Sequence, residues 1–169
     1  ARLLDGPDSS LEPRGVVLVY LVVPAPTWSP FDAHYVPDPE VAFARLSEPK
    51  NYREGPDPAT TTVLCAELPA TVGDTTWTSD DETLRDLVLD GMARCALDPP
   101  AIVDVRTVRL PTVYPVLRAD DPGARQRVLD WADGLTGISV LGRQGLGVAD
   151  NLHHVLDMAL SFADTLPAD

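Results

Sequence analysis

Apolar residues along this chain recur with two spacings, one typical of strands and one typical of helices. Residues 15–23 (GVVLVYLVV) form a continuous β-branched run ended by Pro24, which predicts a middle strand covered on both faces of a sheet. Two shorter extended segments, 32–38 and 41–49, are punctuated by prolines and predict a hairpin. Residues 61–68 alternate and predict a further strand. The first part of the chain is therefore expected to be mainly β.

Helical spacing begins after residue 78. Ser79 and Glu82 have the spacing of a capping box, and 98–100 (DPP) would stop the helix that follows. Residues 102–110 predict a strand at a sheet edge, continued by 112–117. A third helix is expected to start at Asp121-Pro122 and to end at Gly134.

The segment 137–165 reads as a strand, a glycine loop and a helix in direct succession. Residues 138–141 predict the strand, and Asp150 or Asn151 would cap the helix. Between them the glycines follow a G-x-x-G-x-G order, which matches neither common phosphate-binding fingerprint. The start of a helix presents unpaired N–H groups and favours an electron-rich ligand. By spacing alone, the loop is either a structural turn or a cofactor contact.

Strands and helices interleave without a regular βαβ rhythm. This favours an α+β fold, with a mainly antiparallel sheet and helices on one face, plus the C-terminal strand-loop-helix. Three parts are expected. They are a polar lead-in over 1–14, an α+β domain over 15–135, and the strand-loop-helix over 136–169.

Charge and composition exclude several classes of function. Lys and Arg total 13 against 26 Asp and Glu, and the net charge of −13 disfavours nucleic acid and anionic membranes as partners. The longest apolar run, 16–26, is too short for a membrane helix. Cys65 and Cys95 are the only cysteines, no zinc-ligand spacing occurs, and both thiols are expected to be reduced. A cytoplasmic protein without a metal site is the default expectation.

The string GRQGL, followed by a helix that starts Asn-Leu-His-His, resembles the C-terminal flavin segment of FAD-dependent oxidoreductases. The group is that of amine oxidases, protoporphyrinogen oxidases and UDP-galactopyranose mutases. The resemblance implies that the strand and helix belong to a dinucleotide-binding domain. It assigns the FAD phosphates to Gly142 and Arg143, with Gln144 and Gly145 beside them. It places the backbone of Asn151, Leu152 and His153 at the flavin ring.

A second string, Arg45-Leu-Ser-Glu-Pro-Lys-Asn, resembles the substrate-domain signature of the same group. The resemblance implies a small-molecule substrate, with His34, Arg45 and Tyr114 as candidate contacts and Lys50 as a further one. In this group the flavin carries the redox chemistry and the protein positions the substrate. Tyr114 precedes Pro115, which matches a Tyr-Pro step near the active site of several relatives.

Alternatives remain for the individual residues. Arg143 could bind phosphate, or it could form a surface salt bridge. His153 and His154 are adjacent, so they cannot act as an i, i+4 metal pair. A catalytic role is open for either histidine, beside a role in helix-start or interdomain packing.

A complete member of this group begins with a G-x-G-x-x-G strand and helix, which this sequence lacks. We therefore interpret the chain as the later part of an FAD-dependent oxidoreductase that accepts a hydride from a substrate. The N-terminal FAD-binding half would then be a missing partner, and the uncovered C-terminal segment predicts a homo-oligomer. The alternative is a non-catalytic α+β binding or interaction module without the nucleotide-binding half.

Overall fold

The computed structural model describes residues 6–7, 11–116 and 118–166, and backbone contacts divide the chain into two compact units. The sheet unit comprises Arg14–Thr112. The helical unit comprises Ala1–Pro13 and Val113–Asp169. Their boundaries fall inside two long strands, β1 (Glu12–Val23) and β5 (Asp104–Val116). Leu117, at the end of a predicted strand, and most of the predicted lead-in lie outside the described residues.

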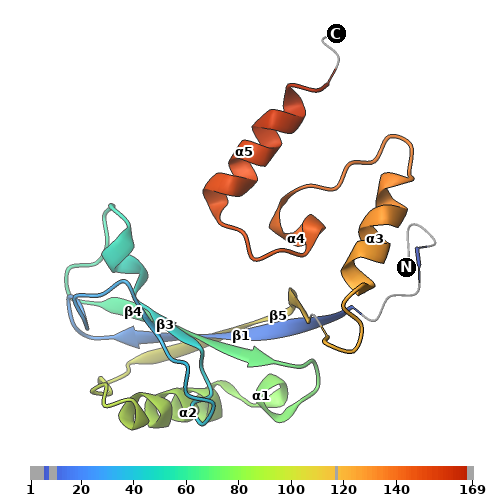
Figure 1. The fold of residues 1–169 in the computed structure, drawn as a ribbon. Coiled ribbons are helices and arrows are strands. Elements are labelled where there is room, and N and C mark those ends of the chain that lie inside the picture. The colour runs from blue at the N-terminus through green and yellow to red at the C-terminus, as the bar shows by residue number, and fades with distance from the viewer. Residues whose placement is uncertain (1–5, 8–10, 117, 167–169) are drawn as a thin grey trace. The chain divides into compact units, whose positions relative to one another are not determined.

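The sheet unit is organised around five strands in the order β2-β3-β4-β1-β5 (Figure 1). The three strands between β1 and β5 in the chain are β2 (Ala33–Tyr35), β3 (Arg45–Ser47) and β4 (Thr62–Ala70). The pairs β1–β4, β3–β4 and β2–β3 are antiparallel. The predicted α+β class, the β2–β3 hairpin and the edge position of β5 are therefore confirmed.

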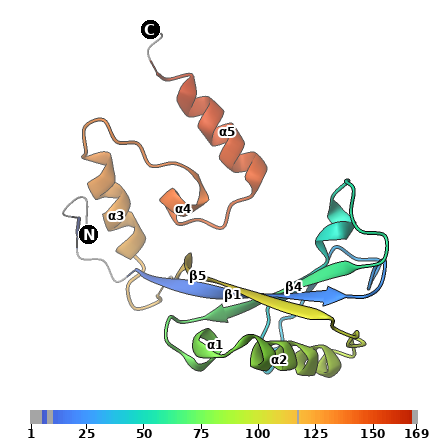
Figure 2. The same cartoon turned by 180° about the vertical axis from the view of Figure 1, so that it is seen from behind.

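Two helices, α1 (Thr75–Thr78) and α2 (Asp81–Arg94), lie against the same face of the sheet (Figures 1 and 2). Alternate residues of β1 point into this layer because side chains alternate across a strand. Val17, Val19 and Leu21 are fully buried there. They meet the apolar stripe of α2, whose buried members are Leu84, Val88 and Met92. This cluster is the core of the sheet unit.

The position predicted for β1 is wrong in two respects. β4 is the middle strand, and β1 lies between β4 and the edge strand β5. The second face of β1 is also less covered, since Leu18, Tyr20 and Val22 are only half-buried. A run of β-branched residues indicates that the backbone prefers the strand conformation, but it does not indicate whether one or both faces of the strand are covered.

The start of α2 also differs from the prediction. Ser79 ends α1, where its hydroxyl donates to the backbone oxygen of Thr75 at 2.7 Å. Asp80 is the N-cap of α2, and its carboxylate accepts the backbone N–H of Thr83 at 2.8 Å. The N-cap predicted at Ser79 is therefore one residue too early, and a cap at Asp80 replaces the predicted Ser79–Glu82 capping box. The reason is the short helix α1, which uses Ser79 at its own C-terminus.

We expect Asp80→Ala to destabilise the protein and Ser79→Ala to have a smaller effect, because only Asp80 accepts a helix N–H group. Hydrogen bonds from the hydroxyl and the backbone N–H of Thr83 hold the pKa of Asp80 below its usual value. This contribution is therefore fully present above the unfolded-state pKa of about 3.9 and is lost as the pH falls through the lower folded-state pKa. Urea midpoints of both variants at neutral and acidic pH measure it. A larger loss in Ser79→Ala would contradict the assignment.

The helical unit contains α3 (Ala124–Asp133), α4 (Gly142–Leu146) and α5 (Leu152–Ala163). α3 ends at Gly134, as predicted from the sequence. Val155 and Met158 of α5 face α4, since the backbone N–H of Gly142 donates to Met158 Sδ at 3.2 Å. Among the described residues, no helix combines the length and the apolar character that crossing a membrane requires.

The strand predicted at 138–141 is absent from the structure. These residues form an irregular segment between α3 and α4, in which Ile138 and Leu141 keep 43% and 37% of their surface exposed. A strand requires a neighbour that pairs with its N–H and C=O groups, and no strand of the described residues pairs with this segment. The predicted glycine loop is likewise replaced in large part by α4.

Candidate functional site

The sheet unit has a second face that neither α1 nor α2 covers, and we call it the open face. Tyr20 and Cys65 are cross-strand partners near its centre. Strand alternation adds Val22 from β1 and Val63 from β4. On β5, Thr107 bonds to Asp81 of α2, so the neighbouring residues of the strand point to the open face. These are Arg106, Val108 and Leu110.

The centre of the open face is apolar and aromatic. Burial raises the pKa of the Tyr20 hydroxyl, and the adjacent Cys65 raises it further. Burial also raises the pKa of the Cys65 thiol to about 11. Since the thiolate is the reactive form of cysteine, Cys65 is not a nucleophile at neutral pH. The two side chains therefore form an unreactive part of this face.

Arg45 lies at the margin of the open face, on β3. Its Nε donates to Glu67 Oε1 of β4 at 2.9 Å, and its guanidinium lies 5.9 Å from the ring centroid of Tyr35. Burial tends to lower the pKa of Arg45, but hydrogen bonds with Tyr35 and Glu67 outweigh burial and raise it overall. Arg45 therefore stays charged, and Glu67 balances that charge.

His34, another predicted substrate contact, points away from the open face. Its cross-strand partner is Leu46, which is fully buried in the helix-covered core, whereas the neighbouring Tyr35 pairs with Arg45. The imidazole stands edge-on to the rings of Trp28 and Phe31, at centroid distances of 5.3 and 5.5 Å. The structure thus places His34 and Arg45 on opposite faces of the same hairpin.

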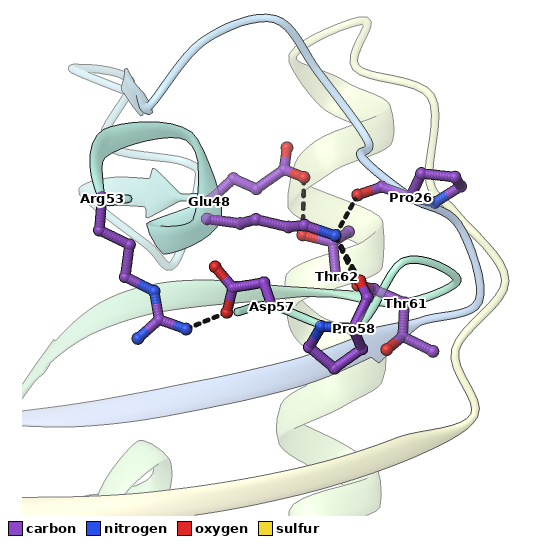
Figure 3. A network of polar contacts seen from close by, with 8 residues as sticks. Pro26, Glu48, Arg53, Asp57, Pro58, Thr61 and Thr62 are labelled. Carbon is purple, nitrogen blue, oxygen red and sulfur yellow. Dashed lines mark hydrogen bonds and ion pairs between the residues drawn. The ribbon is translucent and has the colours of Figure 1, made fainter. Parts of the chain in front are cut away.

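The string Arg-Leu-Ser-Glu-Pro-Lys-Asn holds loops in place. Glu48 is 2% exposed, and its carboxylate accepts the backbone N–H groups of Trp28 and Ser29 at 2.9 Å each. The same carboxylate accepts the hydroxyl of Thr62 at 2.7 Å (Figure 3). Sequence reasoning missed this role of Glu48. The signal in the sequence was an acidic residue directly between a predicted strand and a proline. If such a residue is buried, its charge needs hydrogen-bond partners.

The short 3₁₀ helix η1 (Pro49–Tyr52) continues this network. Lys50 Nζ donates to the backbone oxygens of Pro26 and Pro58 at 2.8 and 2.6 Å, and to that of Thr61 at 3.2 Å. An ammonium group has three N–H donors, so these contacts use all of them. Lys50 therefore has no donor left for a substrate in this conformation.

The helical unit brings together two residues predicted for different roles, Arg143 and Tyr114. The guanidinium carbon of Arg143 lies 5.4 Å from the ring centroid of Tyr114, which is cation–π geometry. Gln144 Nε2 donates to the backbone oxygen of Val113 at 2.9 Å and ties α4 to the end of β5. These residues line a cavity of about 120 Å³ together with Gly147 and Val148.

The glycines around α4 have different local requirements. Gly142 has a φ of +74° and Gly147 a φ of +60°, which side chains with a Cβ rarely adopt. Gly145 has no such angle, but a Cβ there would lie 3.0 Å from Val140 Cγ1. Two glycines therefore set the backbone course of this segment, and the third allows close packing.

The start of α5 carries the remaining predicted cofactor residues, Asn151, Leu152 and His153. Asn151 is the N-cap, its side chain forms no capping hydrogen bond, and the first turn contains no acidic residue. Asp150 Oδ1 instead contacts His154 Nδ1 at 2.5 Å. Among the described residues, no cluster of His, Cys, Asp or Glu could hold a metal ion.

The donors of this segment fit an anionic group. The hydrogen bond from Arg143 is a long one of 3.4 Å, from Nη1 to the backbone oxygen of Asp150, and the side chain is exposed. A guanidinium has five N–H donors in a planar fork that matches phosphate oxygens. The start of α5 adds the backbone N–H groups of Leu152 and His153, to which Asn151 gives no capping hydrogen bond, whereas the Asn151 N–H donates to Asp150 Oδ1 at 3.2 Å. An oxyanion such as phosphate suits these donors.

No protein-family model matches the sequence, and a comparison with curated proteins finds no match. Among solved structures, the fold is similar to that of a reduced UDP-galactopyranose mutase. That similarity has a TM-score of 0.60 and 17% identity over 80% of this chain and 29% of that chain. A proposed protoporphyrinogen oxidase from Exiguobacterium sp. 255-15 is also similar, with a TM-score of 0.56 and 18% identity. That match covers 90% of this chain and 36% of the other, so the chain spans only part of each relative.

Proposed function

We propose that this chain forms the substrate-side sheet and the C-terminal flavin contacts of an FAD-dependent oxidoreductase of the amine-oxidase-like group. The observation that carries the proposal is the pairing of Arg143 with Tyr114 beside the uncapped start of α5. The fold shared with two enzymes named within that group supports it.

Arg143 is the proposed phosphate ligand, because its guanidinium is exposed and forms only a long hydrogen bond in the structure. The positive φ of Gly142 lets the backbone turn toward the ligand without a Cβ in the way. Gln144 and Gly145 support α4, through Val113 and Val140 respectively. The backbone N–H groups of Asn151, Leu152 and His153 complete the proposed contacts with the electron-rich flavin.

Bound FAD would supply the acceptor for a hydride removed from a substrate C–H bond. The residues of this chain would bind and orient that substrate. The apolar centre of the open face, with Tyr20 and Val63, would exclude water, and Arg45 at its margin would offer a charge that Glu67 already balances. The protonated Cys65 would take no covalent part.

The rest of the nucleotide-binding fold is the proposed partner of α5. Leu152, Leu156 and Leu160 follow one another at a spacing of four residues and expose 84%, 58% and 59% of their surface. Residues four apart lie on one face of a helix, so these leucines form an apolar stripe. An FAD-binding half, in the same longer chain or in another, would cover this stripe and pair with residues 138–141.

The test is an NMR titration of the chain with FAD. We expect weak binding, in the millimolar range, because most of the pyrophosphate and adenosine contacts would come from the nucleotide-binding half. Shift changes should gather at 142–147 and 151–154. Arg143→Ala should weaken binding by about 1 to 3 kcal/mol, the scale of a charge-assisted hydrogen bond.

Arg94→Ala is the matched control, since Arg94 is an exposed arginine on α2 that pairs with Asp90. It should leave FAD binding unchanged. If millimolar FAD shifts none of the residues in 142–154, the flavin assignment fails. The non-catalytic interaction module then becomes the better description of the chain.

A further inference from the structure

The helical unit contains a second cavity, of about 580 Å³, which shares residues 147–149 with the cavity at Tyr114. Its walls come from the segment after β5, from the start of α3 and from the backbone at Gly147 and Val148. Two arginines and one carboxylate line it, with Ala119 and Pro122 as apolar surface. The charged residues are Arg118, Asp121 and Arg125. A volume of this order suits a small organic ligand. Neither the flavin contacts nor the open face uses this space.

Most charges around the cavity already have partners. Arg118 forms two hydrogen bonds of 2.9 Å with Asp120, and this pairing lowers the pKa of Asp120. Arg127 forms two hydrogen bonds with Asp121, at 2.9 and 2.5 Å. Asp120 is thus paired with Arg118, and Asp121 is paired with Arg127.

Arg125 is placed differently. It is half-buried at the start of α3, and its Nη1 donates to the backbone oxygen of Leu146 at 3.2 Å. No carboxylate of the described residues forms an ion pair with it. Its aliphatic stem lies along Gly147, where a Cβ would be 3.6 Å from Arg125 Cδ. The stem and the carbonyl of Leu146 therefore hold the guanidinium in place while most of its N–H groups remain available.

We propose that this cavity binds a small molecule with an oxyanion head and an apolar body, and that the guanidinium of Arg125 is its main contact. A planar guanidinium binds phosphate or carboxylate with two parallel hydrogen bonds. The apolar lining at Pro122, Val148 and Ala149 accommodates the body of the ligand. The net charge of −13 opposes an anion only weakly, because physiological salt screens charges beyond about 8 Å.

Calorimetric and NMR titrations of the full chain test this site without flavin. The probes are phenyl phosphate, benzoate and inorganic phosphate at constant ionic strength. Saturable binding of phenyl phosphate or benzoate is expected, with shift changes at 118–125 and 147–149. Comparison of the two probes tells a phosphate ligand from a carboxylate ligand. Changes confined to 142–143 and 151–153 would report the proposed flavin contacts instead, and would overturn this site.

Arg125→Gln should weaken binding by about tenfold or more, and Arg125→Lys by less, because lysine retains the charge but loses the fork. Arg85→Gln on α2 is the control and should bind like the parent chain. Ala149→Trp fills the cavity while keeping Arg125, and it should also abolish binding. This variant tests the site independently of any folding defect in the Arg125 variants. Equal affinity in the parent chain and in Arg125→Gln, or no saturable binding of either organic probe, would refute the proposal.

Discussion

Replacing Glu48 by alanine is expected to lower the free energy of unfolding by about 3 kcal/mol or more, because it leaves buried donors without an acceptor. The carboxylate is 2% exposed and accepts the backbone N–H groups of Trp28 and Ser29 and the hydroxyl of Thr62. The contact with Thr62 is buried and the other two are part-buried, so water replaces the lost acceptor only incompletely. Among the described residues, the loop that carries Trp28 would then be held to η1 only by the donors of Lys50 and Asn51.

Chemical denaturation followed by tryptophan fluorescence measures this effect, with Trp28 as a local reporter. Glu48→Gln keeps one acceptor oxygen and should cost less than Glu48→Ala. Glu54→Ala is the matched control, because Glu54 is an exposed glutamate in the loop after η1. A parent-like midpoint in Glu48→Ala would show that the buried network does not stabilise this part of the fold.

The substitution Gly15→Ala is expected to cost about 2 to 3 kcal/mol, the upper part of the range of about 1 to 3 kcal/mol found when extra atoms are forced into a packed interior. A Cβ on Gly15 would lie 2.9 Å from the backbone oxygen of Leu110 and 3.2 Å from that of Ala70. It would also lie 3.0 Å from the indole of Trp77. The backbone oxygens of Leu110 and Ala70 cannot rotate away as the end of a flexible side chain can, so the strands that carry them must shift.

Gly55→Ala provides the control for Gly15→Ala, since a Cβ on Gly55 would meet nothing within 4 Å. It should change the denaturation midpoint little or raise it slightly, because alanine has less conformational freedom than glycine in the unfolded chain. Similar midpoints for the two variants would contradict the close strand approach at Gly15.

Much of the sheet unit was predictable, because hydrophobic spacing reports local structure. The run 15–23 predicted β1, the alternation at 61–68 predicted β4, and the strand at 102–110 was expected at an edge. The hairpin was found where prolines separated two extended segments. The predicted N-cap of the helix after residue 78 was one residue too early, because propensity alone did not reveal the short helix α1.

Residues of the candidate site were predictable by type but not by arrangement. The resemblance singled out Arg143 and Tyr114 for different roles, and the structure brings them into contact. It also singled out His34 and Arg45 for one role, and the hairpin places them on opposite faces. Tyr20 and Cys65 were not recognised as residues of the open face, because the sequence of an apolar strand does not indicate which of its faces stays uncovered. The domain limits and the cofactor contacts stay predictions.

By itself, the sequence determined most of the periodic elements, the α+β class and the acidic character of the chain, because these follow from composition and from local spacing. Only the tertiary structure decided the order of the strands, the uncovered face of the sheet and the burial of Glu48. It also decided that residues 138–141 are not a strand. Each of these features depends on which segment, distant in the sequence, packs beside the residues in question. The backbone N–H and C=O groups find their hydrogen-bond partners on that neighbouring segment.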